Sequence, residues 1–215
     1  MADLIDYKKY SRQNGGMKYI LVIIDAFSRF AHTAPLKFKT AKESAEAMDQ
    51  IFSKFKFPPV MFTSDKGNTT WWPDFHTHSG NEFLAKNKYI RQILIEKYQM
   101  NVYTMSGRTK GSIVERFNRT LKTRLERYFT ETKSHKWVDV LQQMTKNINN
   151  SVNRSTGFKP SEVTRNNAEE IKARLYSPPD IQKPCSLKIG DRVRIIKGKN
   201  FLEKGYSQST MFSSL

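Results

Sequence analysis

The stretch that decides the fold is residues 18–25, Lys-Tyr-Ile-Leu-Val-Ile-Ile-Asp, in which six consecutive apolar residues lie between a lysine and an aspartate. β-Branched and aromatic side chains favour a strand, and an unbroken apolar run indicates a strand that is buried on both faces. A strand of this kind belongs inside a sheet that is covered by helices on both sides. The stretch therefore predicts a layered α/β protein.

The segments around this strand alternate between strand and helix patterns. Thr40 with Glu43 three residues later has the pattern of a capping box, which begins a helix, and the two prolines at 58–59 end it. The order β-β-β-α-β-α-β-α-α predicts a mixed five-stranded sheet flanked by helices. The other strands are expected at about 3–7, 30–36, 60–63 and 101–104, and the helices at 40–55, 83–98, 113–129 and 137–150.

Composition excludes several classes of protein. The 215 residues include 37 Lys plus Arg and 20 Asp plus Glu, so the formal net charge is 37 − 20 = +17. This charge favours a polyanionic partner, and composition alone leaves DNA, RNA and an anionic membrane surface open. The single cysteine, Cys185, excludes an internal disulfide framework and a cysteine-based zinc knuckle. No apolar run approaches the roughly 18 residues that suggest a membrane span.

Three acidic residues fall on elements that can share a metal site. Asp3 lies on the first expected strand, Asp65 ends the strand after the first helix, and Glu115 begins the long helix. Carboxylates from separate elements suit Mg²⁺, and two such ions would activate the attacking oxygen and stabilise the leaving one in phosphodiester chemistry. Each acid also has a structural interpretation, because Asp65 can start a turn and Glu115 can stabilise a helix N-terminus.

The long helix carries polar groups on the same face as its acid. Glu115, Asn118, Arg119 and Lys122 are spaced i, i+3, i+4 and i+7, which places them side by side on a helix. A carboxylate next to phosphate-binding cations is what a DNA-cutting site needs. The alternative is an ordinary solvated helix face, and the spacing agrees with both interpretations.

Several segments resemble the catalytic core of retroviral-type integrases, and they occur in the order typical of that family. They are residues 2–4 (Ala-Asp-Leu), 19–29, 64–68 (Ser-Asp-Lys-Gly-Asn), 113–122 and the closing segment 153–160. Among integrases the chain is most similar to those of Gypsy-like retrotransposons and, more closely, of Maverick/Polinton DNA transposons. The tail at 187–206 resembles the start of the SH3-like or chromodomain-like barrel that follows such cores.

The resemblance implies an RNase H-like fold with a DDE triad, Asp3, Asp65 and Glu115, that binds two Mg²⁺ or Mn²⁺ ions. The implied activity is metal-dependent processing of DNA 3′ ends followed by strand transfer, in which the freed 3′-hydroxyl attacks target DNA. The implied partners are double-stranded DNA, as element ends and as target, and further copies of the chain in a homo-oligomer in the nucleus. The implied DNA-binding residues are Asn118, Arg119, Lys122, Arg108, Lys110, Arg192, Arg194 and Lys197.

Asp6 competes with Asp3 for the first position of the triad. Residues three apart in a strand point to opposite faces, so only one of the two can face the site. The family pattern favours Asp3, and Asp6 is then a turn or surface acid.

The resemblance divides the chain into a catalytic core at 1–165, a linker at 166–185 and a partial SH3-like DNA-binding segment at 186–215. The second and third triad acids are separated by 49 residues, which is more than the family usually has. Removing residues 69–81 restores the family pattern D-x-G-x-E-F and leaves 49 − 13 = 36 residues.

The thirteen extra residues have two interpretations. We interpret residues 69–81 as a retained intron or gene-model artefact, and the alternative is a genuine surface loop beside the metals. Asp74, His76 and His78 lie within it, but an H-x-H pattern without further partners is a weak metal signal. Sequencing the mature transcript across these codons separates the two interpretations.

The ends of the chain predict a piece of a longer integrase. Asp3 has only two residues before it, and the tail after residue 205 is too short to close a barrel. This raises an alternative function, a catalytically inactive, integrase-derived fragment that binds nucleic acid. A third class, an RNase H-like nuclease, would share the metals but would not need the basic tail.

Overall fold

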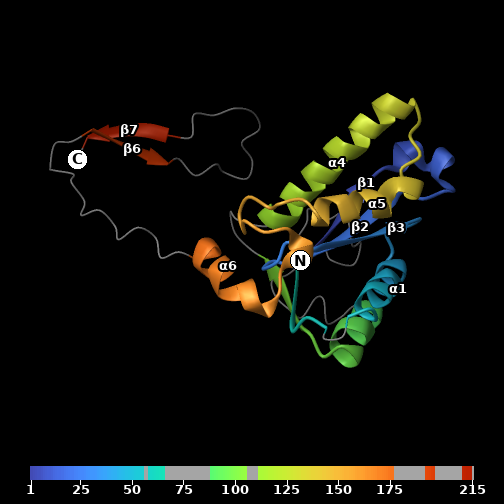
Figure 1. The fold of residues 1–215 in the computed structure, drawn as a ribbon, viewed down its shortest axis with the longest axis horizontal. Helices are drawn as coiled ribbons and strands as arrows, with labels where there is room; N and C mark the ends of the chain where they lie inside the picture. The colour runs from blue at the N-terminus through green and yellow to red at the C-terminus, as the bar shows by residue number, and fades with distance from the viewer. Residues whose placement is uncertain (56–57, 66–87, 106–110, 177–191, 197–209, 215) are drawn as a thin grey trace. The chain divides into compact units, whose positions relative to one another are not determined.

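The computed structural model describes residues 1–55, 58–65, 88–105, 111–176, 192–196 and 210–214 (Figure 1). They belong to two compact units, Met1–Leu175 and Tyr176–Leu215. The predicted α/β class is confirmed. The strands of the first unit are β1 (Ala2–Asp6), β2 (Tyr19–Ile24), β3 (Ala31–Leu36), β4 (Met61–Asp65) and β5 (Asn101–Met105). Its helices are η1 (Lys8–Asn14), α1 (Ala41–Phe52), α3 (Lys88–Ile90), η3 (Arg91–Lys97), α4 (Ser112–Thr132), α5 (Val138–Asn149), η4 (Pro160–Glu162), η5 (Arg165–Asn167) and α6 (Ala168–Leu175).

The five strands form one mixed sheet in the order β3-β2-β1-β4-β5. β2 is antiparallel to both β1 and β3, whereas β4 is parallel to both β1 and β5. The three antiparallel strands follow one another along the chain, with η1 between β1 and β2 and a short loop between β2 and β3. The parallel pairs need helical crossovers, and α1 and the α3–η3 segment lie in the stretches that supply them.

β2 is buried at all six of its residues, as its apolar sequence predicts. Alternate side chains enter two separate hydrophobic clusters because successive residues of a strand point to opposite faces. Tyr19, Leu21 and Ile23 belong to one cluster, and Ile20, Val22 and Ile24 belong to the other.

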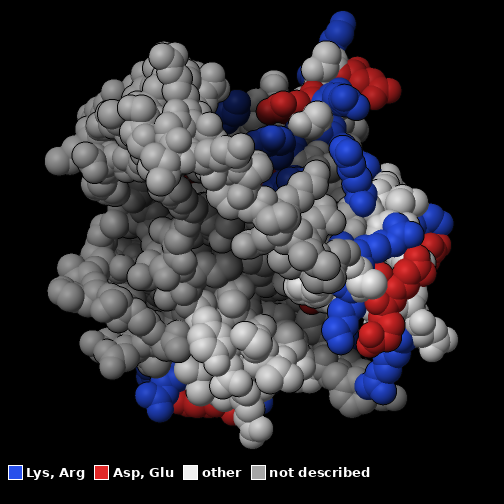
Figure 2. Space-filling model, turned by 90° about the vertical axis from the view of Figure 1, so that its left-hand side faces the viewer, with Lys and Arg blue, Asp and Glu red and all other residues white. Residues whose placement is uncertain are grey.

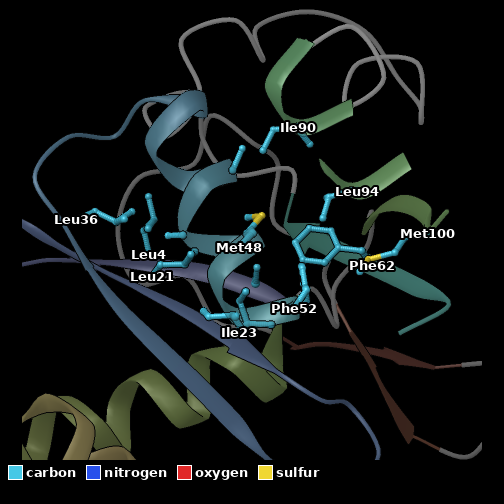
Figure 3. Close-up of a cluster of buried hydrophobic side chains, with 14 of the residues drawn as sticks. Leu4, Leu21, Ile23, Leu36, Met48, Phe52, Phe62, Ile90, Leu94 and Met100 are labelled. Atoms are coloured by element: carbon cyan, nitrogen blue, oxygen red, sulfur yellow. The ribbon is translucent and has the colours of Figure 1, made fainter. Parts of the chain in front are cut away.

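The two clusters lie on opposite faces of the sheet. The first is covered by α1 and η3, and Figure 3 shows Leu21 and Ile23 gathered with Met48 and Phe52 of α1. The second is covered by α4 and α5, which Figure 1 shows on the other side of the sheet from α1. α4 therefore packs directly on β1 and β2, and this packing positions the residues at its beginning.

Helix boundaries differ from the sequence expectations at several ends. Thr40 caps α1 as predicted, by accepting a 3.3 Å hydrogen bond from the Glu43 backbone N–H. The Glu43 carboxylate accepts from the backbone N–H groups of Lys37 and Phe38, further back than a capping box would place it. The described part of the expected 83–98 helix is a short α-helix followed by a π-helix. α4 continues to Thr132 and ends where Lys133 adopts a left-handed conformation with φ of 52°.

A buried asparagine joins the start of the chain to the helix α5. The Asn14 amide donates to the backbone oxygens of Tyr10 and His135, each at 2.8 Å. Its oxygen accepts from the backbone N–H groups of Trp137 and Val138 at 2.7 and 3.1 Å. The first N–H groups of a helix have no partner inside the helix, so Asn14 caps α5 from 123 residues away.

We expect Asn14→Ala to lower the free energy of unfolding by about 2–4 kcal/mol, because it leaves buried backbone groups without partners. Gln13→Ala is the matched control, since Gln13 makes one exposed 2.9 Å hydrogen bond to the neighbouring His135 N–H. The control should cost less than about 1 kcal/mol. Urea unfolding followed by circular dichroism measures both, and equal losses would contradict the capping role.

In the second unit the described residues form a two-stranded antiparallel sheet, β6 (Arg192–Ile196) with β7 (Thr210–Ser214). Arg192 and Arg194 lie on β6. The SH3-like identity of this segment stays a prediction. Arg108, Lys110, Lys197 and the extra residues 69–81 lie outside the described residues. No helix among the described ranges is both long and apolar enough to cross a membrane.

Candidate active site

Two of the predicted triad positions are neighbours at the centre of the sheet. β1 and β4 are parallel, and Ala2 pairs with Ser64. The next residues along the two strands, Asp3 and Asp65, therefore occupy neighbouring positions. Asp65 is the last residue of β4, so this position is at the carboxyl end of that strand.

The Asp3 side chain accepts hydrogen bonds from Leu4 and from Asn118. Its Oδ1 accepts from the backbone N–H of Leu4 at 3.0 Å, and its Oδ2 accepts from Nδ2 of Asn118 at 2.5 Å. Asp3 has the same strand parity as Ile5, which packs under α4 and α5, so it is directed to the α4 side of the sheet. The contact with Asn118 ties β1 to the second turn of α4, and charge-assisted hydrogen bonds of this kind are stronger than neutral ones.

Glu115 lies in the first turn of α4 and is exposed. The helix begins after Gly111, which has φ of +58°, and a Cβ added there would lie 3.5 Å from Oε1 of Glu115. Asn118 is three residues further along, so Glu115 and Asn118 are neighbours on the helix surface. The helix dipole favours a carboxylate at this end, which agrees with the structural interpretation of Glu115, and its catalytic role stays a prediction.

Asn118 is buried at 7% exposure, although the sequence interpretation placed it among the DNA contacts. Its Nδ2 must face Asp3, because an ionised carboxylate only accepts hydrogen bonds. This leaves its Oδ1 buried with no partner among the described residues. An unpaired amide oxygen beside a carboxylate is a pair of oxygen donors, which is the ligand type that Mg²⁺ prefers.

The donor chemistry at this place therefore fits a hard divalent cation. The described side chains contain no group of three His, Cys, Asp or Glu residues that would hold a metal ion. Asp3 on β1 and Glu115 on α4 are two such acids. For Asp65 the structure gives the position of the backbone, next to Asp3 in the strand register. The fit to a divalent cation thus rests on oxygen atoms as ligands and on the strand register that makes Asp3 and Asp65 neighbours.

Asp6, the competitor of Asp3, has different surroundings. It is exposed, and its Oδ1 accepts from the Lys8 backbone N–H at 2.9 Å while its Oδ2 lies 3.3 Å from Lys8 Nζ. Its parity is that of Ala2 and Leu4, which belong to the cluster on the α1 side. Asp3 and Asp6 are therefore directed to opposite faces of the sheet.

The predicted cations on α4 follow Glu115 along one side of the helix. Arg119 and Lys122 are both exposed, and neither forms an ion pair within the part of the chain that the structure describes. Figure 2 shows one face of the molecule, where Lys and Arg side chains gather along one edge with Asp and Glu between them. Because Arg119 and Lys122 form no ion pair with a described carboxylate, this side of α4, next to Glu115, is able to bind an anion.

Comparison with known proteins gives relatives in sequence. No protein-family model matches the chain. It is 36% identical over 200 residues to a putative uncharacterized transposon-derived protein of Caenorhabditis elegans, covering 93% of this chain and 62% of that protein. It is 30% identical over 179 residues to the Pol polyprotein of feline endogenous virus ECE1, covering 82% of this chain and 16% of that protein. It is 28% identical over 149 residues to the Gag-Pol polyprotein of feline leukemia virus, covering 68% of this chain and 8% of that protein. The chain thus spans less than two thirds of each relative.

Solved structures share the fold. The catalytic core domain of BIV integrase has a TM-score of 0.52 at 16% identity, covering 75% of this chain and 89% of that one. The HTLV-2 integrase catalytic core, solved in complex with magnesium in a trimeric form, has a TM-score of 0.52 at 17% identity, covering 76% and 91%. A simian T-cell lymphotropic virus intasome in complex with the PP2A regulatory subunit B56 gamma has a TM-score of 0.58 at 15% identity, covering 99% and 65%.

Proposed function

We propose that this chain, a homologue of transposon-derived and retroviral Pol proteins with the catalytic-core fold of retroviral integrases, catalyses metal-dependent DNA integration. The reaction is 3′-end processing of element DNA followed by strand transfer into target DNA. The catalytic residues are Asp3, Asp65 and Glu115. The observation that carries the proposal is the Asp3 carboxylate, which is fixed by Asn118 of α4 and neighbours the Asp65 position on β4.

The side chains of the site have distinct roles in this proposal. Asp3, Asp65 and Glu115 would hold two Mg²⁺ or Mn²⁺ ions, and these ions would supply polarisation of the phosphodiester and activation of the attacking oxygen. Asn118 keeps the Asp3 carboxylate in one orientation through its 2.5 Å hydrogen bond. Arg119 and Lys122 bind backbone phosphates of the DNA, which positions the strand without reading its sequence.

The partners follow from the same proposal. The substrate is double-stranded DNA, both the element ends and the target, and the active form is a homo-oligomer acting in the nucleus. The trimeric form of the HTLV-2 core and the simian viral intasome support an assembly of several chains. The similarity to a transposon-derived worm protein supports an origin in a transposable element, which we propose to be of the Maverick/Polinton or Gypsy-like type.

Metal removal tests the proposed reaction. With Mn²⁺, we expect the chain to cut a labelled duplex carrying the element's terminal repeat and to join it to a plasmid target. With EDTA in place of Mn²⁺, product formation should fall at least about 100-fold, because metal ions contribute several kcal/mol to such transition states. Gel electrophoresis of the labelled strand measures both steps.

The alternative function gives a different result in the same assay. An inactive, integrase-derived fragment would bind the duplex in a salt-sensitive manner and yield no cut product with Mn²⁺ or with EDTA. Cutting that continues unchanged in EDTA would contradict metal-dependent integration directly.

A further inference from the structure

A pocket lies on the flank of α4 near the end of α5. This pocket of about 360 Å³ is lined by the end of β2, the loop between β2 and β3, one side of α4, the end of α5 and the segment that follows α5. Asp3, Glu115 and Asn118 are not among its lining residues. The pocket is therefore distinct from the candidate active site, although the same helix contributes to both.

The polar part of the pocket is strongly basic. Four of its lining residues are arginines, Arg29, Arg116, Arg124 and Arg154, and none of those lining it in the described chain is Asp or Glu. Arg124 donates to the Ser151 hydroxyl at 3.3 Å. Arg116 and Arg154 are exposed and form no ion pair with a described carboxylate. Arginine stays charged at all physiological pH values, so the pocket has a persistent positive potential.

Helical geometry connects this pocket with the active-site face. Arg116, Thr120 and Arg124 are four residues apart and lie on one flank of α4, whereas Glu115 and Lys122 lie on the opposite flank. Arg119, which is exposed, lies between the two flanks on the outer side of the helix. Cationic side chains thus continue around α4 from the acids to the pocket.

The lining chemistry indicates which anion the pocket accepts. Guanidinium groups match the oxygens of a phosphate in a bidentate geometry. The floor is apolar, formed by residues such as Ile24, Ile113 and Phe117, and it suits the sugar carbons next to a phosphodiester. A small anion would occupy only the pocket, whereas the basic residues extend beyond it toward Arg119. The arrangement therefore fits a chain of phosphates.

We propose that the arginine pocket binds a backbone phosphate of DNA and is a second anchoring point on the opposite flank of α4 from the acids. The inference rests on the proposed function, because it assumes that the polyanion is DNA. It adds to that function a binding site made of Arg29, Arg116, Arg124 and Arg154, none of which is among the DNA-binding residues expected from the sequence.

Equilibrium binding of a labelled duplex in EDTA tests the pocket without any catalysis. The variant is Arg116→Gln combined with Arg154→Gln. The matched control is Lys42→Gln combined with Lys136→Gln, which removes the same charge from exposed residues outside the pocket. We expect the pocket variant to raise Kd about tenfold and to reduce the slope of log K against log salt by about 1, and the control to change Kd less than about twofold.

Neutralising the phosphates of the duplex one at a time shows which phosphate the pocket contacts. Replacing single phosphates of the duplex by methylphosphonates should weaken binding of the wild-type chain at one or two positions and have no effect there on the pocket variant. Thermal melts of all variants check that they are folded.

The outcomes separate this inference from the proposed function. Pocket-dependent binding without Mn²⁺-dependent cutting would leave the pocket established and the integration activity refuted. Normal cutting with a pocket variant that binds like the control would overturn the pocket alone. A wild-type chain that does not bind duplex DNA would also overturn it. So would a pocket variant that loses binding of free pyrophosphate or of RNA but binds duplex DNA as the wild type does.

Discussion

Asp3→Asn should reduce Mn²⁺-dependent cutting and joining of DNA by about three orders of magnitude while the chain remains folded. The substitution keeps the size of the side chain and removes the negative charge that a divalent cation needs. Bound metal supplies several kcal/mol to phosphodiester chemistry, and each 1.4 kcal/mol corresponds to a tenfold change in rate. The measurement is the initial rate of product formation under saturating DNA.

Asp6→Asn is the matched control, because it makes the same chemical change three residues further along the same strand. Asp6 is exposed and pairs with Lys8, and surface ion pairs contribute little to stability. We expect its activity to stay within about threefold of wild type. Loss of activity in Asp6→Asn together with retained activity in Asp3→Asn would refute the assignment of the first acid.

Glu115→Gln tests the same prediction, loss of Mn²⁺-dependent cutting, at another acid of the proposed triad. Its side chain is exposed, so the substitution should leave the melting temperature nearly unchanged and lower the rate as strongly as Asp3→Asn does. A double variant should then be no slower than either single variant, since residues that act as one unit are not additive. Additive losses would indicate that the two acids do not serve the same site.

The fold was largely predictable because its strongest signals are local. The apolar run at Tyr19–Ile24 and the helical periods of α1, α4 and α5 each depend on residues close together in the chain. The resemblance to a retroviral-type integrase core is confirmed by homologous sequences and by the shared fold. The assignments of Asp3, Asp65 and Glu115 to catalysis stay predictions.

The features that escaped the sequence depend on contacts between distant residues. Asn118 had the signal of a polar helix residue, and only the packing of α4 on β1 places it against Asp3. Asn14 caps α5 through a partner 123 residues away, a contact that no local pattern contains. The arginine pocket combines residues such as Arg29 and Arg154 from separate segments, so no local spacing in the sequence predicts it.

Trp137→Ala should lower the free energy of unfolding by about 3–5 kcal/mol, the usual cost of removing a large buried aromatic side chain. Trp137 is 0% exposed and lies in the cluster under α4 and α5, with its ring 5.9 Å from that of Tyr7. The residue precedes α5, where its backbone N–H is bound by Asn14. Urea unfolding followed at 222 nm measures the loss without depending on tryptophan fluorescence.

Trp137→Phe separates the size of the side chain from its polar group. The indole Nε1 is buried with no hydrogen-bond partner among the described residues, and an unpaired buried donor costs about 1–3 kcal/mol. Phenylalanine removes this donor and keeps an aromatic ring, so the gain offsets part of the lost packing. We expect Trp137→Phe to stay within about 1 kcal/mol of wild type. A loss as large as that of Trp137→Ala would show that the indole N–H is paired and that the whole side chain is required.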